Sequence, residues 1–372
     1  MNRTPPSAGS FSVRLQKSIE SAKGPRKDDI YVISNALWFE MIRSELGLPS
    51  AYAVEHHLEP HAIHPKGDGT VKHDCNWAKY AIGDRGPRNA RVEKVEIEVP
   101  GTTRLLKHPL WDILRKPSLS ALETEIWIRT LDGDIQAILL RKNEQRNQNV
   151  MARGPVVTKV QLDMLMRRAG LDALAALVIL VRKATRLGQS EMALKICDHI
   201  YQVLLITCLL PPFRLLVREI FDCFQRRVFS GIQHNDVGID VAAFDCKAFV
   251  VLLDFAVRHT RNKQQLGNLK KDLARICCEL FKVRNIHVNF AVAAPHVNVA
   301  MRTCRFSNDL ENADLNRAWG IRKILGLTIE KLPFSHQKMR QSLAAEKPLE
   351  IPFGSGGVGV LYLHRQSIRY LP

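Results

Sequence analysis

The sequence predicts a mainly α-helical protein, in which a small basic N-terminal module precedes a larger helical domain and a short C-terminal β-like hairpin. Apolar residues recur at spacings of three and four through most of residues 156–345, which is the periodicity of an amphipathic helix. The chain has 372 residues, enough for two or three domains. Its 46% apolar and 24% charged residues are typical of a globular protein and exclude a disordered or fibrous one.

Changes in composition divide the chain into five segments. Residues up to about 30 are polar and rich in Pro, Ser, Lys and Arg, and they predict a flexible basic tail. The best candidate for a linker between domains is the polar run Asn143–Asn149, which is followed by Gly154 and Pro155. The predicted segments are the tail (1–30), the N-terminal module (31–115), a connecting segment (116–155), the helical domain (156–345) and a Gly-containing hairpin or tail (346–372).

The connecting segment has two interpretations. Ser120 followed three residues later by Glu123 predicts a helix with a capping box over Ser120–Leu131. The alternation in Glu125–Arg129, with the turn dipeptide Asp132-Gly133 after it, leaves a β-hairpin as the alternative. We favour the helix.

In the helical domain, the clearest amphipathic segment is Gln265–Lys282. Its apolar face consists of Leu266, Leu269, Leu273, Ile276, Leu280 and Phe281. The pair Pro211-Pro212 must end one helix and begin the next, so Met192–Leu210 and Phe213–Phe229 are predicted to form a helical hairpin. No repeat of fixed period is present, so a solenoid is not supported.

Near the C-terminus, the apolar runs Leu349–Phe353 and Val358–Leu363 flank a Gly-rich stretch and predict a β-hairpin. The stretch Gly354–Gly359 has the composition of a phosphate-binding loop. That function needs a helix to begin directly after the glycines, and a strand-like run follows instead.

The chain carries 54 Lys and Arg against 37 Asp and Glu, a formal charge of +17, which favours DNA or another polyanion as a partner. The longest apolar runs, Ala173–Val181 and Val203–Leu210, are too short to span a bilayer, so no membrane association is expected. The N-terminus has no signal-peptide core. Eight scattered cysteines without a Cys-x-x-Cys pair indicate buried thiols in a reducing compartment, so we expect a soluble cytoplasmic protein.

The most informative local pattern is the segment from Asn76 to Pro87. Trp77 and Tyr80 predict a short helix with an aromatic face, and Gly83 is suited to end it in the left-handed conformation. Farther along, Glu96–Val99 alternates like a strand.

An aromatic residue at Tyr80, then Gly83 and Pro87, then apolar Val92 and Val95, have a spacing similar to the end of the recognition helix in Cro-type phage-repressor helix-turn-helix domains. The resemblance covers Tyr80 to Val95 and lacks the acidic residue that usually follows the aromatic in that family.

The resemblance implies that Lys72, Asn76 and Lys79 approach the major groove of DNA. The basic side chains that surround the turn, Arg85 and Arg88, would then contact phosphates.

Two other clusters are candidates for binding. The first holds the zinc-type ligands His57, His61, His73 and Cys75, with His56 and His64 nearby, although Pro60 interrupts the helix that would align His57 with His61. Exposed loop histidines are the alternative. The second is the basic stretch Arg258–Arg284, whose Lys270, Lys271 and Arg275 are candidates for phosphate contacts; the alternative is a solvated helix face.

No nucleophile elbow, metalloprotease motif or Walker loop is present, so the prediction leans away from an enzyme. The leading hypothesis is a DNA-binding protein of regulatory or mobile-element type, whose helical domain supplies oligomer or effector contacts. The alternatives are a helical interaction protein with an acidic partner and a metal-dependent enzyme that uses the His56–Cys75 cluster.

Overall fold

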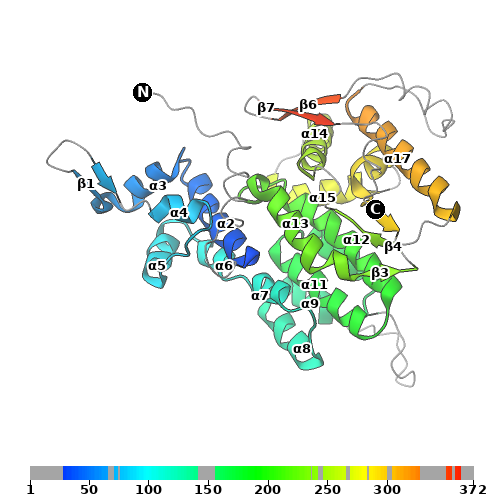
Figure 1. Cartoon of the computed structure of the whole chain (residues 1–372), viewed down its shortest axis with the longest axis horizontal. Helices are drawn as coiled ribbons and strands as arrows, with labels where there is room; N and C mark the ends of the chain where they lie inside the picture. Colours follow the sequence, from blue (N-terminus) through cyan, green and yellow to red (C-terminus); the bar gives the residue numbers. More distant parts are fainter. Residues whose placement is uncertain are drawn as a thin grey trace. The chain divides into compact units, whose positions relative to one another are not determined.

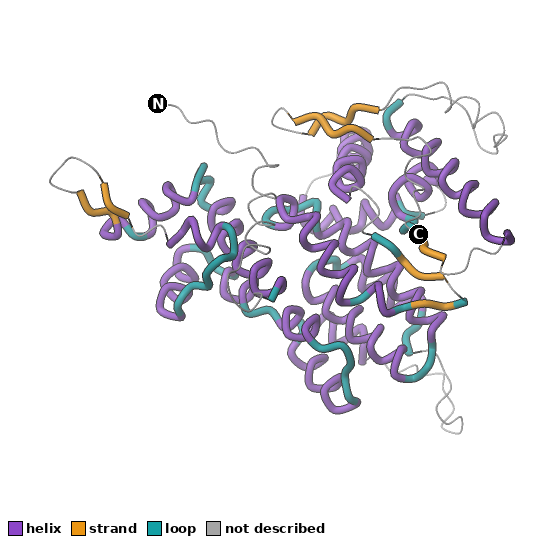
Figure 2. The backbone as a smooth tube through the Cα atoms, viewed as in Figure 1, coloured by secondary structure: helices purple, strands orange, loops and turns teal. Residues whose placement is uncertain are grey.

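The computed structural model describes residues 28–65, 71–73, 76–140, 156–235, 237–241, 246–264, 269–282, 285–299, 304–326, 349–353 and 357–361. It confirms a mainly helical protein (Figures 1 and 2). The chain forms two compact units. Unit 1 comprises residues 1–115 and 210–223, and unit 2 comprises residues 116–209 and 224–372. The predicted N-terminal tail before Asp28 and the predicted linker Asn143–Asn149 lie outside the described residues.

Unit 1 is built from short helices around the longer helix α2, with a β-hairpin between α3 and α4 (Figure 1). Its elements are α2 (Asp29–Glu45), α3 (Ala51–Leu58), the 3-10 turn η1 (Pro60–Ala62), β1 (Ile63–Pro65), β2 (Val71–His73), α4 (Asn76–Ala81), α5 (Asn89–Glu98), α6 (Thr102–Leu106), α7 (Pro109–Arg115) and η2 (Phe213–Leu216).

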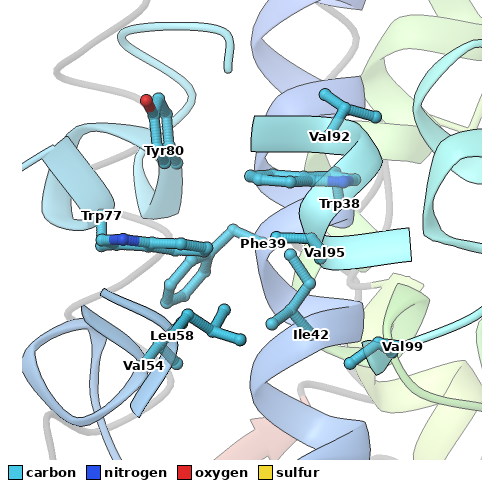
Figure 3. Packing of buried hydrophobic residues seen from close by; sticks show 10 residues of the cluster. All are labelled: Trp38, Phe39, Ile42, Val54, Leu58, Trp77, Tyr80, Val92, Val95 and Val99. Atoms are coloured by element: carbon cyan, nitrogen blue, oxygen red, sulfur yellow. The ribbon is translucent and has the colours of Figure 1, made fainter. Parts of the chain in front are cut away.

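An aromatic cluster forms the centre of unit 1. Trp38 of α2 stacks on Trp77 of α4 with ring centroids 5.7 Å apart, and Tyr80 meets both indoles edge-on. Val92 and Val95 of α5 pack on the same cluster, which is completed by Phe39, Ile42, Val54, Leu58 and Val99 (Figure 3). All ten side chains are at most 4% exposed, so this core joins four helices.

Unit 2 is a helical assembly that has two small antiparallel sheets among its described residues, β3–β4–β5 and the terminal pair β6–β7. Its helices are α8 (Ala121–Thr130), α9 (Gly133–Leu140), α10 (Lys159–Arg167), α11 (Leu171–Arg186), α12 (Ser190–Thr207), α14 (Cys246–Gln264), α15 (Leu269–Leu280), α16 (Ile286–Val288) and α17 (Cys304–Ile324), with the π-helix η5 (Asn289–Ala293) and the 3-10 turn η3 (Phe229–Gly231). The strands are β3 (Gln233–His234), β4 (Val237–Ile239), β5 (Val297–Val299), β6 (Leu349–Phe353) and β7 (Gly357–Leu361). Helix α13 (Val217–Arg227) begins in unit 1 and ends in unit 2.

Helices α11 and α12 form the core of unit 2. Every residue from Ala173 to Val181 is buried, so the longest apolar run of the chain is a helix covered on all sides. Within the described ranges, none of the helices combines the length and apolar character that crossing a bilayer requires.

Several predicted elements are confirmed. The capping box begins α8, because Ser120 Oγ accepts the Glu123 N–H at 3.1 Å and the Glu123 carboxylate accepts the Ser120 N–H at 2.9 Å. The amphipathic segment near residue 270 is α15, in which Ile276 and Leu280 are buried. The C-terminal hairpin pairs Leu349 with Leu361 and Phe353 with Gly357.

One expectation is wrong. The expected strand at Glu96–Val99 lies at the end of helix α5, because Val92, Val95 and Val99 all point into the aromatic core at helical spacing (Figure 3). One helical segment ends before Pro211-Pro212 and another begins after it, as expected, because α12 ends at Thr207 and η2 begins at Phe213. Helix α12 packs on α11, and the pairing of Met192–Leu210 with Phe213–Phe229 as a hairpin stays a prediction.

Glu96 shows why the end of α5 is polar. Its carboxylate accepts the backbone N–H groups of Gly101 and Thr103 and the Thr102 hydroxyl, so it caps the start of α6. Partial burial opposes ionisation of Glu96, but these hydrogen bonds outweigh it and lower its pKa to about 2.

Side chains from two helices satisfy the carbonyl groups at the end of the π-helix η5. The Tyr201 hydroxyl donates to the Val292 carbonyl at 3.0 Å, and Gln202 Nε2 donates to the Ala293 carbonyl at 3.2 Å. Arg317 of α17 donates to the Ala294 carbonyl at 2.9 Å and also contacts the His296 ring. These bonds tie α12, η5 and α17 together.

Six cysteines lie within the described side chains, all are buried, and none of them is in a disulfide bond there: Cys197, Cys208, Cys223, Cys246, Cys277 and Cys278. Burial raises the pKa of the Cys278 thiol to about 12. The pKa values of Cys197, Cys208 and Cys277 are raised by the same cause.

The burial of His296 leads us to expect that the folding stability of unit 2 falls at acidic pH. Burial, assisted by the charge of Arg317, lowers the pKa of His296 below its ordinary value of 6.5. The folded state therefore keeps this ring neutral, while the unfolded chain binds a proton as the pH falls below 6.5. Stability attributable to His296 is complete above that pH and is lost below it, by at most about 1.4 kcal/mol per pH unit.

The measurement is the free energy of unfolding between pH 7.5 and pH 5 for the parent and for His296→Gln, which cannot titrate. We expect a flatter profile for the variant. Identical slopes for the two proteins would contradict the assignment.

Candidate nucleic-acid interface

A basic groove opens on unit 1 between the end of α3, helix α4 and helix α5. Its volume is about 630 Å³. The groove is lined by Glu59, Asn76, Lys79, Tyr80, Arg85, Arg88, Ala90, Arg91 and Lys94. Five of these lining residues are cationic and one is acidic, so the groove favours an anionic ligand.

Four residues that the sequence singled out for nucleic-acid binding meet in this groove: Asn76, Lys79, Arg85 and Arg88. Lys72 lies on β2 opposite His64, and its side chain is outside what the structure describes. The remaining three candidates, Lys270, Lys271 and Arg275, lie on α15 in unit 2. Arg275 is exposed, and the side chains of the two lysines are not described.

The turn after α4 positions the groove's arginines. Gly83 adopts φ +67°, its N–H donates to the Tyr80 carbonyl at 2.9 Å, and the Asp84 N–H donates to the Lys79 carbonyl at 2.9 Å. This pair of bonds is a Schellman cap, which confirms the expectation that Gly83 ends the helix in the left-handed conformation. The cap turns the chain so that Arg85 and Arg88 follow Lys79 along the groove.

Two of the groove's cations, which sequence reasoning missed, are held within the fold. Arg91 Nε donates to Glu59 Oε1 at 2.6 Å, and the same guanidinium bonds the Tyr80 hydroxyl and lies 5.6 Å from the centre of its ring. Lys94 Nζ donates to the Leu58 carbonyl at 2.8 Å, at the C-terminal end of α3. Burial opposes the charge of Arg91, but its bonds to Glu59 and Tyr80 raise its pKa.

Glu59 connects the walls of the groove. Its second oxygen accepts the Trp77 Nε1–H at 3.2 Å, so one carboxylate joins the residue after α3 to both α4 and α5. Both oxygens of this carboxylate are therefore bonded within the fold, one of them to Arg91 of the groove.

The other three cations lie at the rim. Lys79 and Arg88 are exposed, and no hydrogen bond or ion pair is assigned to either within the part of the chain that the structure describes. Arg85 donates to Asn76 Oδ1 at 3.3 Å, an exposed bond that a stronger acceptor can replace. The arrangement can therefore place three cationic side chains on one anionic ligand.

The spacing of Arg91 and Lys94 in the sequence is the feature from which their place in the groove could have been predicted. The two residues are three apart, which places them on one edge of a helix. That edge becomes visible only when residues 89–98 are assigned to a helix, and the alternating Glu96–Val99 concealed it.

The histidine cluster does not form a metal site among the described residues. No group of three His, Cys, Asp or Glu side chains there is placed to hold a metal ion. His57 is paired with Glu98 of α5, and His61 is exposed. His73 lies on β2 opposite Ile63, and its side chain, like the whole of Cys75, is outside the described part.

The basic stretch near residue 270 spans two helices rather than one continuous face. Arg258 lies on α14, where it pairs with Asp254 at 2.8 Å, and Arg275 lies on α15. Lys282 pairs with Glu279 just after α15. Arg284, the last residue of the predicted stretch, lies outside the described residues.

The segment between α3 and α4 differs from the tight turn that joins the two helices of a helix-turn-helix domain. Between α3 and α4 the chain forms η1 and the β1–β2 hairpin, at the point where helix-turn-helix domains have a tight turn. Comparison of the chain with protein-family models, with curated proteins and with solved structures found no match. The resemblance to phage repressors stays a prediction.

Glu59 provides a test of the groove's construction. Glu59→Gln removes the charge that neutralises the partly buried Arg91 and weakens the bond from Trp77. We expect a loss of about 1–3 kcal/mol in the free energy of unfolding of unit 1. Chemical unfolding followed by tryptophan fluorescence measures it, with exposed Glu93→Gln on α5 as the charge-matched control. An effect no larger than that of the control would contradict the assigned role of Glu59.

Proposed function

We propose that this protein binds DNA and that the basic groove of unit 1 contacts its phosphate backbone. The observation that carries the proposal is the division of the groove's cations. Arg91 and Lys94 are bonded within the fold, whereas Lys79 and Arg88 extend from the rim with no assigned partner in the described part of the chain. Cations that do not serve the fold are available to a ligand.

Phosphate is the anion that suits this rim. Lysine and arginine side chains supply much of the positioning contact in protein–DNA complexes, and a guanidinium can donate two parallel hydrogen bonds to phosphate oxygens. The groove is open along α4 and the first part of α5, so it can follow a chain of phosphates. The formal charge of +17 over the whole chain would steer a polyanion towards the protein.

A regulatory or mobile-element role remains our favoured context, with the helical unit 2 supplying contacts to an effector or to a second copy. The support for this context is the local resemblance from Tyr80 to Val95 together with the basic groove that this segment lines. Phosphate contacts alone carry no sequence information, so a specific site would need further contacts to base edges.

The test is the salt dependence of duplex binding. The double variant Lys79→Ala/Arg88→Ala removes two proposed phosphate contacts without touching a buried residue. We expect weaker binding to a labelled random-sequence duplex, and a slope of log affinity against log salt that is shallower by about 1.8.

The matched control is Arg129→Ala/Lys195→Ala, which removes two exposed cations of unit 2 and the same charge. The proposal predicts a clearly smaller effect for this control. Equal losses for the two double variants would show that only the overall charge matters. Failure of the parent to bind DNA even at low salt, together with groove-dependent binding to polyglutamate, would instead favour an acidic protein partner.

A further inference from the structure

The loop that carries the groove's arginines lies directly against helix α2. A Cβ atom at Gly83 would come within 2.3 Å of the Val32 carbonyl oxygen, and one at Gly86 would come within 2.6 Å of the Tyr31 hydroxyl. A side chain at Gly83 would therefore clash with the backbone of α2, and one at Gly86 would displace the Tyr31 hydroxyl. The loop follows the surface of α2 between these two points.

Tyr31 holds the middle of this loop. Its hydroxyl oxygen accepts the Gly86 N–H at 2.7 Å, across 55 residues of sequence. Asn35, one turn farther along α2, donates from Nδ2 to the Tyr31 carbonyl at 2.9 Å, and its side-chain oxygen lies beside Gly86. Tyr31 is 39% exposed, so a substitution there does not remove a side chain of the buried core.

The position of this bond in the loop connects it to the groove. Gly86 lies between Arg85 and Arg88, the two rim arginines. At one end the loop is fixed by the Schellman cap on α4, and at the other the Arg88 carbonyl accepts the N–H groups of Arg91 and Val92 in the first turn of α5. The Tyr31 bond fixes the stretch between these ends, and this stretch is the backbone from which the Arg85 and Arg88 side chains extend.

We propose that Tyr31 is a positioning residue for DNA binding, which holds Arg85 and Arg88 in register with Lys79. This inference rests on the proposed function of the groove. Tyr31 does not line the groove, so it acts through the loop. Holding the loop in its bound conformation lowers the entropy that phosphate binding must overcome.

Tyr31→Phe removes the hydroxyl and retains the ring and the net charge. The loss of one hydrogen bond corresponds to about a threefold to tenfold loss of duplex affinity. The salt slope stays unchanged because no cation is removed. The thermal midpoint changes little, because the ring is partly exposed. Tyr52→Phe, which removes an exposed hydroxyl from α3, is the matched control and should leave affinity unchanged.

Gly86→Ala tests the same contact from the loop side. Its methyl group would displace the Tyr31 hydroxyl, so affinity should fall to a similar extent with the charge again unchanged. Repeating Tyr31→Phe in the Arg85→Ala/Arg88→Ala background completes the test. With no arginines to position, the tyrosine substitution should have no further effect.

Two results would overturn the inference while leaving the groove intact: unchanged affinity of Tyr31→Phe, or an equal loss of affinity with and without the arginines. A fall in the thermal midpoint without a fall in affinity would reduce Tyr31 to a purely structural role. A parent protein that does not bind DNA would overturn the proposed function, and the inference with it.

Discussion

The architecture of unit 1 depends on the burial of Trp38 against Trp77 and Tyr80. Helix α4 has six residues, too few for a helix to persist alone in water. Its two aromatic side chains anchor it to α2, and each buries a large apolar area in edge-on or stacked contact with Trp38. Asn76 and Lys79 share that helix, so the same contacts decide where the polar face of α4 lies.

The groove also shows how a fold accommodates many like charges in a small space. Five cations around one cavity repel one another, and this repulsion opposes folding. Arg91 is offset by Glu59 and by the face of the Tyr80 ring, and Lys94 by a helix-terminal carbonyl with its partial negative charge. The cost that remains is concentrated at the rim, where water screens the charges most effectively.

Local chemistry made much of this predictable from sequence. The Ser120–Glu123 capping box, the stop at Gly83 and the C-terminal hairpin each follow from a few adjacent residues, and the structure contains all three. The resemblance and the turn singled out Asn76, Lys79, Arg85 and Arg88, which line one groove because they lie within thirteen consecutive positions, 76–88. Glu59 was beyond reach, because its partners Trp77 and Arg91 are 18 and 32 residues away and only the tertiary fold brings them together. The pattern in Glu96–Val99 misled because Val99 continues a helical spacing that begins with Val92 and Val95, upstream of the alternating stretch.

The buried cysteines can serve as intrinsic reporters of local opening in unit 2. A thiol reacts with an alkylating reagent as the thiolate, and burial that raises the pKa of Cys278 to about 12 leaves almost none at neutral pH. Alkylation at Cys197, Cys208 or Cys277 must then wait until the surrounding helices open. Because these cysteines lie on or beside α12 and α15, the alkylation rate at each would report the opening of its own part of unit 2 with no label introduced by mutation.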